Sequence, residues 1–171
     1  MSDKKLKVGV VLGSDSDLNA MKGCFAVLDG YKIPYELRII SAHRTPGAAR
    51  DFASGARENG FGVLIAAAGK AAHLAGVLAS YTTLPVIAVP IKSSALEGLD
   101  SLLSSVQMPK GVPVATVAID GAENAAILSA QILSLSNTEI RTALSDAKLA
   151  MEREICAKDA AAKDLLRTIL K

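Results

Sequence analysis

The chain has 171 residues, a length that fits one domain able to bury its own core. Its 19 Lys and Arg against 17 Asp and Glu leave a formal net charge of +2, a surplus too small to predict nucleic acid or a membrane surface as a partner. Half of the residues are apolar and only 4% are aromatic, with a mean hydropathy of +0.33. This hydropathy is high for a lone domain, so we expect apolar surface to be buried against other copies of the chain.

The residue types predict neither a metal site nor a cofactor site. Cys24 and Cys156 are far apart in the sequence, which argues against metal ligation and a disulfide framework and favours a reducing cytoplasm. The sequence contains neither a GxGxxG dinucleotide turn nor a Walker lysine motif. Three Phe and three Tyr are few for the aromatic walls of a flavin site. We therefore expect no cofactor and no metal.

Apolar runs alternate with helical patterns over the first 135 residues. The runs predict five strands, at residues 7–12, 35–40, 62–67, 85–89 and 113–119. The patterns between them predict helices at residues 17–28, 46–59, 72–80 and 122–135, and a short helix within 96–106. Gly30 and Gly60 are expected to end the first two helices.

Residues 61–79 are apolar over about the length that a membrane-spanning helix needs. Lys70 and His73 lie in the middle of this stretch, and glycines are distributed through it. A strand, a glycine turn and a helix explain these interruptions better than a spanning helix does. We therefore expect no membrane partner.

Strands that alternate with helices and are apolar on both faces predict an α/β fold with three layers, α/β/α. Five strands joined by right-handed crossovers favour a parallel sheet in the flavodoxin-like order 2-1-3-4-5. We expect residues 1–171 to form a single α/β domain with its core at residues 6–135.

Residues 138–171 carry apolar side chains at helical spacing, with charges between them and no further strand to cover. This pattern predicts a C-terminal extension of one long amphipathic helix or two shorter ones. We favour a role in subunit packing, and a helix folded back on its own domain is the alternative.

Three loops are expected to meet at one edge of the predicted sheet. In this strand order the chain reverses direction between strands 1 and 3, so a crevice opens at their carboxyl ends. The loops at residues 13–17, 41–44 and 68–73 converge there, and both histidines of the chain, His43 and His73, lie in them. The sequence therefore predicts a functional site at this crevice.

The first two loops have the residue types of an anion site. Residues 13–17 read GSDSD and can present backbone N–H groups and the Ser14 and Ser16 hydroxyls at a helix N-terminus. Arg44, from the neighbouring loop, would add bidentate donors to a bound phosphate. Ordinary helix capping is the alternative interpretation of these residues.

The two histidines are assigned different tasks. An imidazole suits proton transfer near neutral pH, so His43 is the candidate acid–base. His73 is either a second acid–base or a brace for its loop, and we favour the brace because it enters an Ala-rich helix that must pack closely.

The three loops together closely resemble those of the N5-carboxyaminoimidazole ribonucleotide mutase family of purine biosynthesis. The matching segments read GSDSD at 13–17, SAHRTP at 41–46 and AAHL at 71–74, and the likeness covers roughly residues 6–135. The resemblance implies an ATP-independent isomerase with a small-molecule substrate, whose carboxylate moves from the exocyclic nitrogen to ring carbon C4. In this family the reaction is pictured as decarboxylation followed by recapture of the trapped CO2, with His43 at the position of the proton shuttle.

The resemblance also implies the substrate-binding residues, with Asp17 suited to the ribose hydroxyls. They are Ser14, Ser16, Asp17, Ser41, Arg44, Gly69, Lys70, His73 and Leu74. It further implies a homo-octamer, because the family assembles as octamers. Two alternatives stay open: a direct CO2-dependent aminoimidazole ribonucleotide carboxylase, and a non-catalytic module that binds a nucleotide phosphate.

Two positions depart from the family pattern. Gly-Gly is usual before Ala-Ala-His where this chain has Gly69-Lys70, and Leu-Pro-Gly is usual where it has Leu74-Ala75-Gly76. The Lys70 ammonium either alters substrate affinity or points to solvent. The related carboxylase branch typically lacks Ala-Ala-His-Leu in its third loop, so the chain sides with the mutases.

Overall fold

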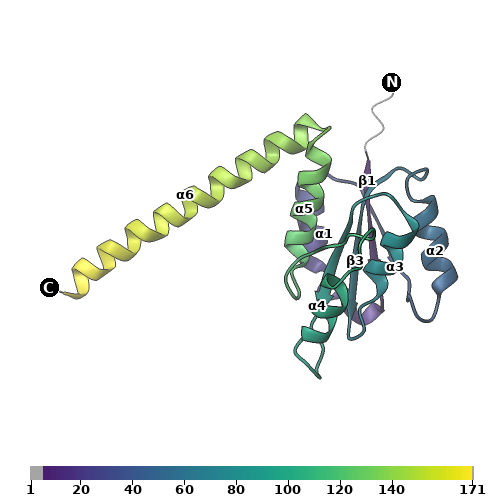
Figure 1. Cartoon of the computed structure of the whole chain (residues 1–171). Coiled ribbons are helices and arrows are strands. Elements are labelled where there is room, and N and C mark those ends of the chain that lie inside the picture. Colours follow the sequence, from purple (N-terminus) through teal and green to yellow (C-terminus); the bar gives the residue numbers. More distant parts are fainter. Residues whose placement is uncertain (1–5, 171) are drawn as a thin grey trace. The chain divides into compact units, whose positions relative to one another are not determined.

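The computed structural model describes residues 6–170, and its strands form a parallel sheet in the order β2-β1-β3-β4-β5 (Figure 1). The strands are β1 (Lys7–Leu12), β2 (Tyr35–Ile39), β3 (Phe61–Gly69), β4 (Val86–Ile91) and β5 (Ala115–Thr116). The predicted flavodoxin-like strand order is confirmed.

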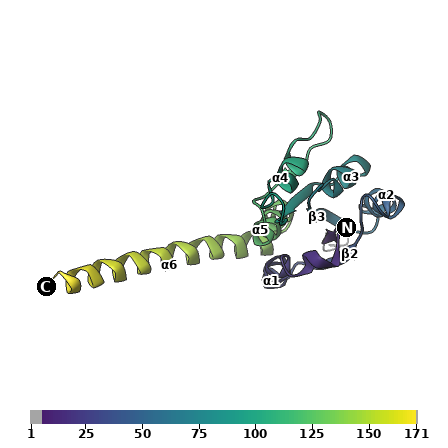
Figure 2. The same cartoon turned by 90° about the horizontal axis from the view of Figure 1, so that it is seen from below.

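Helices cover both faces of this sheet. They are the 3-10 helix η1 (Asp15–Leu18), α1 (Lys22–Gly30), α2 (Pro46–Gly55), α3 (Leu74–Tyr81), α4 (Leu99–Val106) and α5 (Ala122–Ser134), followed by α6 (Thr138–Ile169). Figure 2 shows α1 and α5 on one side of the strands and α2 and α3 on the other. The three predicted layers are therefore present.

The buried core explains why the central strands read as continuous apolar runs. All six residues of β4 are buried, as are the last five residues of β1. On one face, Leu64 and Ala66 of β3 pack in a cluster with Ala53 of α2 and Leu78 of α3. A parallel sheet covered on both faces requires such strands, because each side chain meets a helix layer whichever way it points.

The first helix differs from its prediction at residues 17–28. The chain first forms η1, whose N-cap Ser14 accepts a hydrogen bond from the Ser16 N–H at 3.3 Å, and α1 begins only at Lys22. The helix ends at Gly30 as expected, but the left-handed residue that follows it is Lys32, with φ 55°. The Ile33 N–H donates to the Leu28 carbonyl at 2.9 Å, which is the backbone bond of a Schellman end.

The second helix is shorter than the predicted range of residues 46–59, because α2 ends at Gly55. Beyond it the Ala56 N–H donates to the Ala53 carbonyl, an i→i−3 bond that tightens the chain into successive turns. Gly60, with φ 80°, ends this segment as expected, and the Phe61 N–H then donates to the Ala56 carbonyl at 3.1 Å.

The fifth strand has only two residues where the sequence predicts residues 113–119. Pro90 of β4 explains the early end. Its carbonyl faces the fifth strand and accepts from the Asp120 N–H at 2.9 Å. The proline ring has no N–H to donate on the same side, so the ladder cannot continue there. The ladder stops at the pair Ala88–Thr116. The other predicted strands and the last two core helices lie within two or three residues of their expected bounds.

The described chain divides into two compact units, with the division between Leu133 and Ser134. The second unit contains α6, a single helix where the sequence allowed one or two, and Asn137 caps it by accepting from the Ile140 N–H at 3.1 Å. The last predicted helical residue, Lys171, lies outside the described residues. None of the helices described is both long and apolar enough to cross a membrane.

Candidate active site

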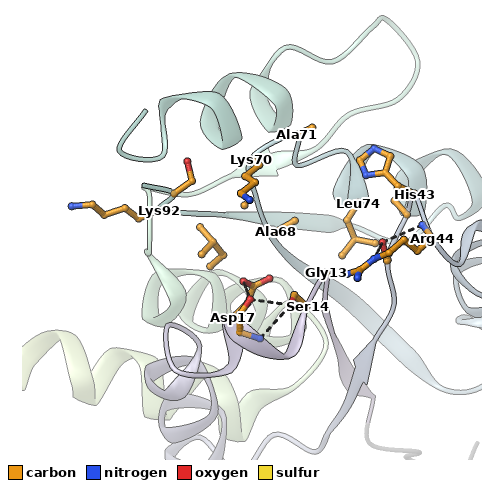
Figure 3. Close-up of a pocket in the computed structure, with 16 residues that line it drawn as sticks. Gly13, Ser14, Asp17, His43, Arg44, Ala68, Lys70, Ala71, Leu74 and Lys92 are labelled. Carbon is orange, nitrogen blue, oxygen red and sulfur yellow. Dashed lines mark hydrogen bonds between the residues drawn. The ribbon is translucent and has the colours of Figure 1, made fainter. Parts of the chain in front are cut away.

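A cavity of about 590 Å³ opens where the three predicted loops meet, beyond the carboxyl ends of β1, β2 and β3 (Figure 3). Nine of the ten predicted site residues line it: Ser14, Ser16, Asp17, Ser41, His43, Arg44, Gly69, Lys70 and Leu74. The tenth, His73, is not among the lining residues but contacts the ring of His43. The strand order and the rule that parallel sheets bind ligands at their carboxyl ends together predict this location.

The first loop supplies hydroxyls and a buried carboxylate. The Ser16 hydroxyl lies 2.9 Å from the Ser14 hydroxyl and donates to Asp17 Oδ1 at 3.2 Å. Asp17 is only 8% exposed, and burial raises the pKa of its carboxyl, partly offset by the Ser16 hydrogen bond. A carboxylate in this position suits donors from a ligand, such as sugar hydroxyls.

The second loop holds its arginine by a local hydrogen-bonded turn. The Ser41 hydroxyl accepts from the Arg44 backbone N–H at 3.2 Å and from Arg44 Nε at 3.3 Å. The Thr45 N–H donates to the Ser41 carbonyl at 2.8 Å, and Pro46 then starts α2. In Figure 3 the guanidinium lies beside Gly13 of the first loop. Among the described residues no carboxylate pairs with Arg44, so its charge is available to an anion.

The two histidines form a direct contact between the second and third loops. His43 Nε2 and His73 Nδ1 are 2.8 Å apart, and the rings meet edge to face with centroids 5.0 Å apart. Since one nitrogen must donate and the other accept, the contact restricts the tautomers of the pair. His43 lines the cavity, and its contact with His73 joins the second loop to the third.

The third loop holds a lysine in an uncommon backbone conformation. Lys70 has φ 57°, in the left-handed region, and its carbonyl accepts from the Ala72 N–H at 2.9 Å. The His73 N–H donates to the Ala71 carbonyl at 2.8 Å, and α3 begins at the next residue. Lys70 is exposed and is one of the residues that line the cavity (Figure 3).

The predicted site residues leave out a fourth segment of the cavity wall, residues 91–93 at the end of β4. Ser93 is 8% exposed and its hydroxyl donates to both carboxylate oxygens of Asp100, at 3.1 and 3.0 Å. Lys92 points away from the cavity in Figure 3 and pairs with Glu97. β4 lies next to β3, so its carboxyl end belongs to the same edge, and extending the predicted strand by two residues would have located the segment.

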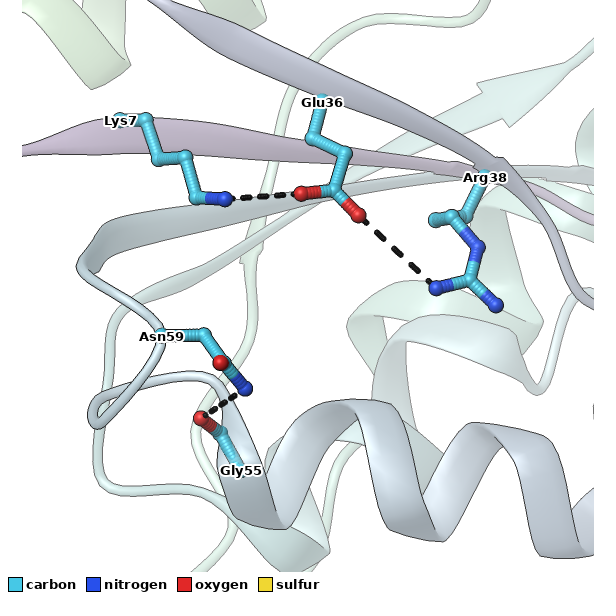
Figure 4. Close-up of polar contacts among 5 residues, drawn as sticks. All are labelled: Lys7, Glu36, Arg38, Gly55 and Asn59. Carbon is cyan, nitrogen blue, oxygen red and sulfur yellow. Dashed lines mark hydrogen bonds and ion pairs between the residues drawn. The ribbon is translucent and has the colours of Figure 1, made fainter.

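A second hollow of about 520 Å³, beside β1, β2 and α2, has charges that satisfy one another (Figure 4). Glu36 accepts from Lys7 Nζ at 2.7 Å and lies 3.8 Å from Arg38. Asn59 donates to the Gly55 carbonyl at 2.9 Å. Because these groups already have partners, we regard the first cavity as the candidate site, since its Arg44 and Lys70 form no ion pair with a described residue. Within the described residues, no group of three or more His, Cys, Asp and Glu could hold a metal ion.

Comparison with known proteins identifies the family. The sequence model of a family described as "AIR carboxylase" matches residues 7–154, a range that contains all three loops and most of the chain. The chain belongs to the AIR carboxylase family. The resemblance deduced from the loop residues is thereby confirmed.

Relatives in the AIR carboxylase family share both the sequence and the fold. A Pyrococcus horikoshii protein named N5-carboxyaminoimidazole ribonucleotide mutase is 55% identical over 91% of this chain and 88% of its own. A Thermotoga maritima protein of the same name is 53% identical over 89% of each. The crystal structure of Treponema denticola PurE superposes with a TM-score of 0.82 at 28% identity, covering 90% of this chain and 96% of the other.

The cavity of this AIR carboxylase family member combines three chemical capacities. An imidazole that can exchange protons lies on the same loop as a guanidinium that pairs with no described carboxylate. Hydroxyls and a buried carboxylate face them from the first loop. A lysine ammonium enters from the third loop. Together they suit a phosphorylated sugar derivative that gains and loses a proton during reaction.

Proposed function

We propose that the protein is an isomerase that converts N5-carboxyaminoimidazole ribonucleotide to 4-carboxy-5-aminoimidazole ribonucleotide, without ATP, in de novo purine biosynthesis. The observation that carries the proposal is the meeting of His43 and Arg44 with the GSDSD loop around one cavity. The names of the relatives from Pyrococcus horikoshii and Thermotoga maritima agree with it.

The reaction requires one proton to be given and one to be taken. His43 donates to the exocyclic nitrogen as the bond from this nitrogen to the carboxyl carbon breaks, which leaves an amine and CO2. Carbon C4, made electron-rich by the amine, attacks the CO2 carbon and forms the new carbon–carbon bond. His43 then removes the C4 proton, so the ring returns to its starting protonation state and no other reactant is consumed.

Binding of the ribonucleotide is assigned to the groups around His43. Arg44 with the Ser14, Ser16 and Ser41 hydroxyls binds the phosphate, since charge-assisted donors and a helix N-terminus suit a dianion. Asp17 accepts from the ribose hydroxyls. The remaining contacts come from the third loop: Gly69, Lys70 and Leu74, with His73 holding His43 in place.

Exposed apolar stripes support assembly into a homo-octamer, with packing between subunits as the role of α6. Leu99, Leu103 and Val106 of α4 follow helical spacing and are each about half exposed. Met151 and Ile155 repeat this pattern on α6 and are 54% and 62% exposed. Such stripes are costly in water and are typical of interfaces. Sedimentation velocity tests the assembly, and a monomer at micromolar concentration would contradict it.

The experiment that tests the function supplies purified protein with N5-carboxyaminoimidazole ribonucleotide, and in a second mixture with aminoimidazole ribonucleotide and bicarbonate. Turnover of the first substrate without ATP is the expected result. Activity only in the second mixture would make the protein a direct carboxylase. Binding of both ribonucleotides without turnover would make the protein a non-catalytic module. In each case we propose that the protein is located in the cytoplasm.

A further inference from the structure

Lys70 is the residue of the cavity whose position is hardest to explain by folding alone. Its φ of 57° lies in the left-handed region, where a side chain other than Gly, Asn or Asp is disfavoured by roughly 1 kcal/mol. This chain has the lysine where the family pattern has Gly, and the carbonyl bond to the Ala72 N–H needs no particular side chain. Strained positions of this kind gather at ligand sites.

The charge of Lys70 is not used in an ion pair within residues 6–170. None of the ion pairs among these described residues includes it, and its side chain is exposed to the cavity. The other lysine of the cavity wall, Lys92, differs on both counts, because it pairs with Glu97 and points away. Lys70 is therefore the lysine whose charge the cavity offers to a ligand.

The proposed substrate carries two anionic groups, and the cavity offers two cations on different loops, neither of them in an ion pair with a described residue. Arg44 shares its loop with the hydroxyl of Ser41 and lies beside the GSDSD loop, so it suits the phosphate. Lys70 shares its loop with His73, whose ring contacts the proton-transferring His43 at 2.8 Å. The group that reacts next to His43 is the carboxylate. With Arg44 assigned to the phosphate, Lys70 is the cation left for the carboxylate.

We propose that the Lys70 ammonium binds the carboxylate of the ribonucleotide. It thereby determines the preference of the cavity for carboxylated over uncarboxylated ligands. This inference rests on the proposed function of the cavity. The contact exists both before and after the carboxylate migrates, since substrate and product each carry it. It is absent at the CO2 stage, because CO2 has no net charge. Lys70 therefore stabilises the bound ribonucleotide more than the CO2 stage, so it lowers KM without raising kcat.

Two ligands that differ only by the carboxylate separate this role from any other. We measure the Kd of aminoimidazole ribonucleotide and of 4-carboxy-5-aminoimidazole ribonucleotide for the wild type, Lys70→Met and Lys70→Arg. Lys70→Met is expected to weaken the carboxylated ligand about tenfold while the uncarboxylated ligand stays within about twofold, and Lys70→Arg restores the preference. Lys32→Met is the matched control, since Lys32 has nearly the same φ at the end of α1, outside the cavity.

An equal loss for both ligands, or no loss for either, overturns the assignment to the carboxylate. The isomerase assay of the wild type tests the proposed function separately. If the wild type binds both ribonucleotides but does not turn over N5-carboxyaminoimidazole ribonucleotide, the proposed function fails while the Kd ratio still decides the role of Lys70. If the wild type binds neither ribonucleotide, both proposals are wrong.

Discussion

His43 Nε2 and His73 Nδ1 lie 2.8 Å apart and join two loops that are 30 residues apart in the sequence. A hydrogen bond between two imidazoles uses one nitrogen of each ring, so each ring has one nitrogen left for other partners. For His43 that remaining nitrogen is the one available to a ligand. The bond also limits rotation of the His43 ring. A fixed ring orientation is required because His43 first gives a proton and later takes one.

Replacing His43 with Asn is expected to lower kcat for the isomerisation by about 10²- to 10⁴-fold while leaving the affinity for the ribonucleotide nearly unchanged. Asn can form hydrogen bonds but does not exchange protons near neutral pH. The measurement is steady-state kinetics combined with calorimetric binding. Undiminished kcat in His43→Asn would show that another group moves the proton.

Replacing His73 tests its role as a brace. His73→Leu removes the hydrogen-bond partner of His43 and is expected to lower kcat about 10- to 100-fold, because a misoriented imidazole transfers protons poorly. His73→Gln keeps a hydrogen-bonding side chain at that place and should recover much of the rate. Similar kcat values for the two variants would contradict a role through the hydrogen bond.

Arg44→Ala is expected to act mainly on binding. Loss of the charge-assisted hydrogen bonds to phosphate should raise KM about 10- to 100-fold with a much smaller change in kcat. The corresponding nucleoside, which lacks the phosphate, serves as the control ligand. Its affinity for the wild type and for Arg44→Ala should be similar, and an equal loss for nucleotide and nucleoside would place Arg44 elsewhere on the substrate.

The strand order and the meeting of the three loops could be predicted because they depend on pattern alone. Buried parallel strands read as apolar runs, and the order of five such strands determines which loops are neighbours. His43 and Arg44 then fall at one cavity without any knowledge of contacts between side chains. Residue types within loops further indicated which of them could bind anions.

Features that depend on single backbone bonds could not be predicted in this way. The end of β5 follows from the missing N–H of Pro90, and the left-handed Lys32 takes a place that the sequence assigned to Gly30. The bond between His43 and His73 is likewise a matter of side-chain rotamers. Secondary-structure propensities of residue types do not describe single hydrogen bonds or rotamers, so the ends of helices and strands are less certain than their types.

The left-handed Lys32 predicts a stabilising substitution outside the cavity. Lys32→Gly removes the steric cost of φ 55° and is expected to raise the free energy of unfolding by about 0.5–1 kcal/mol, after the greater chain entropy of Gly in the unfolded state is deducted. Arg50→Gly, in the middle of α2, is the control and should lower it by about 1 kcal/mol. Urea denaturation measures both, and destabilisation by Lys32→Gly would contradict the assignment of strain.

The buried thiol of Cys24 predicts a loss of stability at high pH. Burial raises the pKa of this thiol from 9.0 to about 12, so the folded protein keeps it protonated while the unfolded chain releases the proton from about pH 9 upward. Because the folded pKa lies above the unfolded one, the contribution of this thiol to the free energy of unfolding is fully present below pH 9. Between the unfolded and the folded pKa it falls by about 1.4 kcal/mol per pH unit. In a Cys156→Ala background, urea denaturation at pH 8, 9.5 and 10.5 should show this slope, and Cys24→Ala in the same background should lack it. Other groups titrate over the same range, so the difference between the slopes of the two proteins isolates the effect of Cys24. Equal slopes would mean that its thiol titrates as freely in the folded chain as in the unfolded one.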